Sequence, residues 1–109
     1  MATSYKVLGQ VNPAATTATT AYTVASSTET VVSSVMICNA GGSPATYRLA
    51  VRPDGAGLEN KHYLVYDSSI APQSTDTLTL GITLNASDVV TVYASTENLA
   101  FNLFGSEIA

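Results

Sequence analysis

The chain has 109 residues, of which 46% are hydrophobic and only 11% are charged, and its net charge is −4. This length suits one domain with one compact core, and the composition excludes a disordered chain, which needs low hydrophobicity or a high net charge. Four basic residues against eight acidic ones argue against nucleic acid or an anionic membrane as partner, because both attract clustered lysine and arginine.

Alternation of apolar and polar residues with a period of two recurs along the chain and predicts β-strands. In chain order, the predicted strands cover residues 5–11, 20–25, 31–39, 47–52, 61–67, 76–83, 90–95 and 99–103. The run at 31–38 is apolar on both faces apart from two serines, which favours a central strand. About eight strands at this spacing predict an all-β fold, an antiparallel β-sandwich, with the jelly roll as one topology.

Turn-forming residues separate these strands. Asn39–Pro44 and Pro53–Gly57 combine glycine with proline or aspartate, which favours tight turns. Ala71–Ser74 and Asn85–Asp88 separate later strands, and residues 94–98 have the length of a hairpin connection between the last two.

The first 18 residues differ from the predicted sandwich domain at 19–109. Pro13–Ala18 contains only small residues after its proline and has no periodicity. It is either a link that follows an extended N-terminal arm or an ordinary loop between the first two strands, and the sequence leaves both open. As an arm, the segment would add a strand to a neighbouring chain. The candidate assembly residues are Tyr5, Lys6, Val7, Leu8 and Val11.

Residue types that carry chemistry are scarce. His62, the one histidine, lies beside Lys61 without a nucleophile-elbow motif, and we expect it on the surface or at a strand edge. Cys38, the one cysteine, excludes an intrachain disulfide and is expected to be a buried, inert thiol. One histidine and one cysteine are too few for a zinc site. We therefore predict no enzyme activity, no catalytic residues, no metal and no cofactor.

The acidic and aromatic residues leave one alternative open. Acids near predicted turns are expected to form those turns rather than a calcium site, since each loop carries only one or two of them. They are Asp54, Glu59, Asp67, Asp76 and Asp88. The tyrosines mostly fall inside predicted strands, as core or interface residues with hydroxyls at the rim, and the chain has no tryptophan platform for sugars. A carbohydrate site is therefore a minor hypothesis.

The low charge itself predicts assembly. With so few charged residues, a monomer would expose large uncharged patches. Its strand edges would also carry few of the lysine or proline residues that prevent pairing with another chain. Cores of protein interfaces are depleted in charge and enriched in aromatic residues and methionine. We expect self-association, with a trimer favoured, or docking on a larger lattice.

Several segments of the sequence resemble a family of small virion proteins of tailed bacteriophages, including cyanophages. They are residues 22–24, 31–39 (VVSSVMICN), 47–56 (YRLAVRPDGA), 60–67 (NKHYLVYD), 78–84, 88–95 (DVVTVYAS) and 101–108 (FNLFGSEI). The resemblance covers about residues 20–108 and implies a β-rich virion component made in the host cytoplasm. The first twenty residues match less clearly.

Within this resemblance, two roles compete. The first is a capsid decoration or cement protein that binds the major capsid protein, often at three-fold positions. The second is a neck, tail or fibre component, against which the lack of coiled-coil heptads weighs mildly. A hypothesis of another class is a surface module that binds carbohydrate or a receptor through the turns 39–44 and 53–57.

Overall fold

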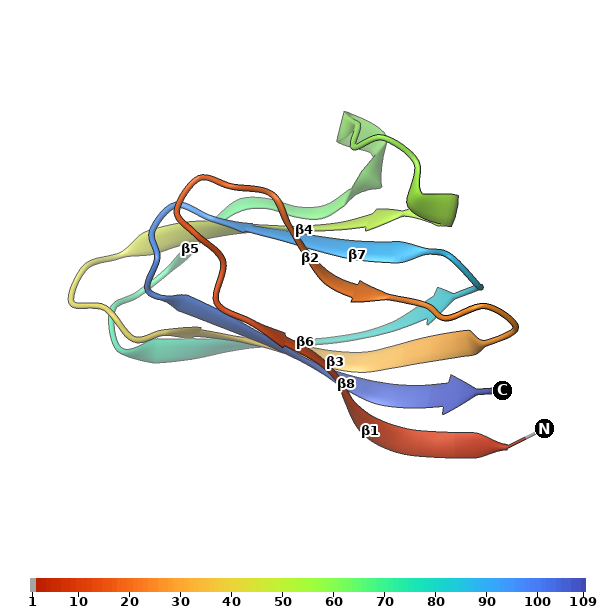
Figure 1. The fold of residues 1–109 in the computed structure, drawn as a ribbon. Coiled ribbons are helices and arrows are strands. Elements are labelled where there is room, and N and C mark those ends of the chain that lie inside the picture. Colours follow the sequence, from red (N-terminus) through yellow and green to blue (C-terminus); the bar gives the residue numbers. More distant parts are fainter. Residues whose placement is uncertain (1) are drawn as a thin grey trace.

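The computed structural model describes residues 2–109 and consists of two four-stranded antiparallel sheets packed face to face (Figure 1). The strands are β1 (Thr3–Val11), β2 (Thr19–Thr23), β3 (Glu29–Asn39), β4 (Ala45–Arg52), β5 (Tyr63–Ile70), β6 (Ser74–Leu84), β7 (Val89–Ala94) and β8 (Leu99–Ile108). Two short 3-10 turns, η1 (Pro53–Gly55) and η2 (Asn60–His62), lie between β4 and β5. The predicted all-β sandwich is confirmed, and each predicted strand overlaps an observed one.

The strand order is that of an eight-stranded jelly roll. One sheet, here called sheet A, has the order β1-β8-β3-β6, and the other, sheet B, has the order β2-β7-β4-β5. The predicted central position of β3 is confirmed, because it pairs with both β8 and β6. The predicted hairpin at 94–98 is wrong: β7 and β8 belong to different sheets, so these residues cross from one sheet to the other.

The core fills the space between the sheets with alternate residues of the strands. Its largest fully buried side chains are Tyr47, Phe101, Ile37, Leu49, Ile70, Leu99 and Leu103. Tyr47 of sheet B and Phe101 of sheet A meet edge to face, with ring centroids 6.2 Å apart, a favoured aromatic geometry. Each fully buried Leu, Ile or Phe contributes about 1.5–3 kcal/mol, so this layer holds the two sheets together.

Sheet A bends along one line of β-bulges. The register shifts at the same level in all three strand pairs: at Leu8 against β8, at Ser33 against β8, and at Gly81 on β6. Gly81 has a φ of 61°, a backbone conformation that glycine adopts without strain. Bulges bend a strand and increase its twist, and β1 and β8 curve accordingly in Figure 1.

The N-terminal segment is a strand of the sandwich within the single chain. β1 pairs with β8 from Thr3 opposite Ile108 to Val11 opposite Phe101, and residues 12–18 are the loop that joins it to β2 in sheet B. Within the single chain, residues 12–18 are a loop between two strands of the sandwich, and the arm that exchanges β1 with a neighbouring copy stays a prediction. Leu8 and Val11 pack against the core.

Candidate functional site

The outer face of sheet A carries one charged residue among the strands of residues 2–109, Glu29 at the first position of β3, opposite Ile108. Beyond that end the face is uncharged on all four strands. Cross-strand register and the alternating burial of β3 and β8 define this surface, which we call the sheet A face. Its rows are Tyr5–Ser106–Val31–Thr83, Val7–Phe104–Ser34–Thr79, Gln10–Asn102–Met36–Thr77 and Ala100–Cys38–Thr75. Tyr5 is 86% exposed and Val7 is 49% exposed. The face is thus a broad uncharged surface with apolar and aromatic groups open to solvent.

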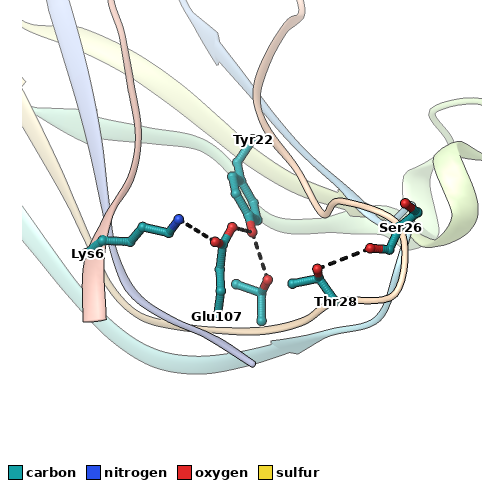
Figure 2. A network of polar contacts seen from close by, with 6 residues as sticks. Lys6, Tyr22, Ser26, Thr28 and Glu107 are labelled. Carbon is teal, nitrogen blue, oxygen red and sulfur yellow. Dashed lines mark hydrogen bonds and ion pairs between the residues drawn. The ribbon is translucent and has the colours of Figure 1, made fainter. Parts of the chain in front are cut away.

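Apart from Glu29, the charged residues in the strands of sheet A point toward the other sheet. Lys6 on β1 forms an ion pair with Glu107 on β8. Glu107 also accepts a hydrogen bond from the hydroxyl of Tyr22 on β2 (Figure 2). Asp76 on β6 likewise accepts a hydrogen bond from the hydroxyl of Tyr47 in sheet B, at 3.0 Å. These ionic groups serve contacts between the sheets and leave the sheet A face neutral.

The pair Tyr22 and Glu107 has perturbed acidities with clear causes. The ammonium group of Lys6, and then the hydroxyl of Tyr22, lower the pKa of Glu107. Burial, followed by the hydrogen bond to Glu107, raises the pKa of Tyr22 to about 12. The Tyr22 hydroxyl also lies 2.7 Å from that of Thr30 on β3. Because the Tyr22 hydroxyl donates its one proton to Glu107, it accepts a hydrogen bond from the Thr30 hydroxyl. Together with the Lys6–Glu107 ion pair, these contacts join β1, β2, β3 and β8.

The outer face of sheet B has the opposite character, with an arginine stacked among tyrosines. The guanidinium carbon of Arg48 lies 4.2 Å from the ring centroid of Tyr66 and 4.1 Å from that of Tyr93. Asp67 holds the same group through two hydrogen bonds, at 2.6 and 3.2 Å. This contact lowers the pKa of Asp67 and raises that of Arg48. The guanidinium is therefore fixed in position and its charge is neutralised.

A recess lies beside this stack, where η2 meets β5. Its lining residues are Asn60, Tyr63 and Tyr66, and its volume is about 350 Å³. The rings of Tyr63 and Tyr66 meet edge to face, with centroids 4.9 Å apart. In a regular strand these two side chains would point to opposite faces, but register shifts in β5 bring them together. The expectation of buried tyrosines with rim hydroxyls holds for Tyr22 and Tyr47.

The structure corrects two expectations about single residues. His62 was expected on the surface or at a strand edge, but the structure buries it in η2. Its Nδ1 accepts a hydrogen bond from the backbone N–H of Glu59, which closes the turn and holds the ring against the protein. Cys38 was expected to be buried, but it is only half-buried. It lies on the sheet A face, since the buried positions of β3 are its neighbours Ile37 and Asn39.

Two of the acids expected to form turns, Asp67 and Asp76, lie instead inside β5 and β6, where they contact Arg48 and Tyr47. Asp88 does form a turn, as expected. Its carboxylate accepts the backbone N–H groups of Asn85 and Asp54, both at 2.8 Å, and so ties the turn after β6 to η1. Within residues 2–109, no three His, Cys, Asp or Glu side chains converge on a candidate metal site. No helix in this described range is long and apolar enough to cross a membrane.

The two turns proposed for a carbohydrate or receptor site do not meet. Asn39–Pro44 precedes β4 and Pro53–Gly57 follows it, so the eight residues of this strand separate them by about 26 Å. They lie at opposite ends of the sandwich (Figure 1). The shared site expected from these turns is therefore wrong, because two turns that flank a single extended strand lie at its opposite ends.

Comparison with known proteins gives no match, either to a protein-family model or to a curated sequence. Two surfaces of this chain are left as functional candidates on their geometry. The sheet A face is neutral, broad and partly apolar, and suits contact with another protein. The recess at Asn60, Tyr63 and Tyr66 is small and aromatic, and suits a small ligand or one unit of a larger one.

Proposed function

We propose that this protein is a structural component of a tailed-bacteriophage virion, where it decorates the capsid and stabilises the head. The observation that carries the proposal is the sheet A face, whose four cross-strand rows contain no charged side chain; Glu29 lies beyond these rows, at the start of β3. The resemblance of residues 20–108 to small virion proteins supplies the phage context. The major capsid protein is the partner, and the virion is the place of action.

The chemistry of the sheet A face supports a protein partner. Tyr5, Val7 and Met36 are exposed there, and Phe104 is half-buried. Interface cores are depleted in charge and enriched in aromatic residues and methionine. Burying this face against a capsid surface would remove apolar area from water at about 25 cal/mol per Å², with no ion to desolvate. Thr and Ser hydroxyls between the apolar groups would bind partner backbone.

The edges of sheet A support self-association. β1 and β6 are its two edge strands, and they lie on opposite sides of the sheet. Pairing of β1 in one copy with β6 in the next is a head-to-tail contact, which closes into a ring when the rotation permits. A trimer around a three-fold axis is one such ring. The bulge at Gly81 leaves Ser74–Thr79 as the regular part of the β6 edge.

Two side chains of the candidate assembly segment contribute to the sheet A face. Tyr5 and Val7 lie on the sheet A face, whereas Lys6 is engaged with Glu107 and Leu8 packs against the core. Deletion of β1 would therefore damage the sandwich as well as the docking surface. Point substitutions on the outer face test docking more cleanly.

A matched pair of lysine substitutions tests the docking surface. Thr77 on β6 and Ser69 on β5 are both exposed hydroxyl residues on edge strands, but Ser69 belongs to sheet B. Particles lacking the protein are incubated with each purified variant, and the bound fraction is measured. Thr77→Lys should weaken binding by about tenfold or more, since an unpaired buried lysine costs over 1.4 kcal/mol. Ser69→Lys should bind like the wild type. Equal binding of both variants would reject the sheet A face.

Cryo-electron microscopy of intact particles tests the location. Density for the sandwich at capsid three-fold positions would support decoration. Density only at the neck, tail or fibres would reject decoration and support the alternative role, in which the same face binds neck or tail proteins. A particle without this protein would overturn both. Light scattering of the purified chain tests the trimer separately, and a monomer both in solution and on the particle would reject it.

A further inference from the structure

We propose that the recess formed by Asn60, Tyr63 and Tyr66 is a binding site for a neutral saccharide ring. The site lies on the outer side of sheet B, away from the sheet A face. It is therefore independent of the proposed capsid contact. On a decorated particle, this side of the sandwich would point away from the capsid and meet glycans of the surroundings.

The size and walls of the recess fit one sugar ring. Its volume of about 350 Å³ lies at the lower end of the range for ligand sites. Tyr66 is 58% exposed although it lies within β5, so a large aromatic surface is open to a ligand. The C–H groups of a sugar ring pack on such a surface, while the amide of Asn60 offers donors and an acceptor to its hydroxyls.

The aromatic wall is held rigid before any ligand arrives. The Tyr66 ring is in contact with the Tyr63 ring at 4.9 Å between centroids and with the guanidinium of Arg48 at 4.2 Å. Asp67 fixes Arg48 from the side with two hydrogen bonds. Asp67 itself has a φ of 53°, a strained conformation for a residue other than glycine, and it accompanies the bulge that turns Tyr66 outward. A prearranged wall reduces the entropy cost of binding.

The electrostatics favour a neutral ligand over an anionic one. The nearest guanidinium, that of Arg48, is already neutralised by Asp67, and the chain carries a net charge of −4. A phosphate or sulfate group would find no free cation in the recess lining and would be repelled at long range. Hydroxyl groups need only the dipoles of Asn60 and the tyrosine hydroxyls.

A proline-rich peptide fits this surface less well than a sugar. Such peptides dock in grooves between aromatic rings, and the gap between Tyr66 and Tyr93 would be such a groove. Arg48 fills this gap, since its guanidinium lies about 4 Å from both rings. What is left open is the single recess beside Tyr63, which is too local for an extended chain.

Titration of the full chain with sugars tests the site. Glucose, galactose, mannose and their neutral tetrasaccharides are added up to about 10 mM, because a one-ring site is expected to bind with a Kd of about 1 mM. Binding is followed by the amide NMR signals of Asn60 and Tyr66. At least one sugar should shift them saturably. Tyr66→Ala should weaken binding more than about tenfold, whereas Tyr5→Ala, which removes an exposed tyrosine from the other sheet, should not.

A second variant and a peptide titration complete the test. Asn60→Ala should weaken sugar binding while leaving thermal unfolding unchanged, since Asn60 is exposed. A decaproline peptide is titrated in parallel. The proposal is overturned if no sugar binds, if decaproline shifts the same signals and the sugars do not, or if Tyr66→Ala binds sugar like the wild type. None of these results bears on Thr77→Lys and particle binding, so the two proposals fail separately.

Discussion

The hydroxyl of Tyr22 on β2 donates a 2.5 Å hydrogen bond to Glu107 Oε2 on β8, and so links the two sheets of the sandwich. Lys6 extends this link to the edge strand β1, and Thr30 extends it to β3. The carboxylate is an acceptor for two donors here, which suits its ionised form. This polar cluster adds side-chain contacts to β1, which pairs with only one strand, β8, among residues 2–109.

Removal of the Tyr22 hydroxyl should weaken the fold. In Tyr22→Phe, Glu107 and Thr30 both lose a partner in a partly buried position, and the free energy of unfolding should fall by about 1.5 kcal/mol. Urea unfolding followed by circular dichroism measures the change. Tyr5→Phe is the control, because Tyr5 is 86% exposed, and it should unfold like the wild type. Equal stability of all three proteins would contradict a structural role for the cluster.

Acidification should destabilise the protein through Glu107. Its pKa in the folded state is lowered from the ordinary 4.5, so the folded protein releases this proton more readily than the unfolded chain. The resulting stability is present above about pH 4.5 and is lost as the pH falls through the folded pKa. Unfolding free energies measured across this range should fall less steeply in Glu107→Gln than in the wild type.

A second acidic group titrates nearby and needs its own control. The pKa of Asp67 is also lowered, by Arg48, and its exposed position makes its effect on stability small. Asp67→Asn should therefore retain most of the acid dependence of the wild type. If Asp67→Asn flattens the profile and Glu107→Gln does not, the assignment to Glu107 is wrong.

The Tyr22 hydroxyl should ionise at a higher pH than the hydroxyls of exposed tyrosines. Its pKa is raised to about 12, mainly by burial, whereas an ordinary tyrosine ionises near 10. A group with a raised folded pKa gives stability that is intact below the unfolded value and is lost as the pH rises through the folded value. Absorbance of tyrosinate should show ionisation above the ordinary range from both Tyr22 and Tyr47, whose pKa is also raised by burial. Tyr22→Phe should remove one of these two components, and an unchanged high-pH absorbance in this variant would contradict the assignment to Tyr22.

Most of the fold could be predicted because one face of each sheet is buried. Burial on one side imposes a period of two, and this pattern located all eight strands, with Val31–Asn39 in the centre. Pairing is set by contacts between distant residues, such as Val11 with Phe101, which leave no local pattern. For this reason the connection at 94–98 was predicted as a hairpin, although it crosses between sheets.

The candidate surfaces were less predictable because bulges break the period. Regular alternation along β5 would separate Tyr63 from Tyr66, whereas the register shifts bring their rings together. The low charge of the chain did indicate an assembly surface, but the strand order was needed to place Tyr5 and Met36 on one face. Cys38 was expected inside because its neighbours are apolar, and only the packing of sheet A against sheet B, seen in the buried Ile37 and Asn39, shows which side of β3 faces out.

Gly105 should tolerate no side chain, because the bulge in sheet A brings β8 close to β3. A Cβ atom at Gly105 would lie only 1.9 Å from the carbonyl oxygen of Val31. This atom belongs to the backbone of a central strand, so it cannot move aside as a flexible side chain would. Gly105→Ala should therefore lower the free energy of unfolding by about 3 kcal/mol, as overpacking of a rigid site does.

Gly42 provides the matched control for this substitution. It lies in the loop before β4, and a Cβ atom there would meet nothing within 4 Å. Gly42→Ala should change the unfolding free energy by less than about 0.5 kcal/mol. Thermal and urea unfolding of the two variants give the comparison. If Gly105→Ala were as stable as Gly42→Ala, β8 could not approach β3 this closely. The bend of sheet A, and with it the placement of Tyr5 and Val7 beside Phe104 on the docking surface, would then have to be revised.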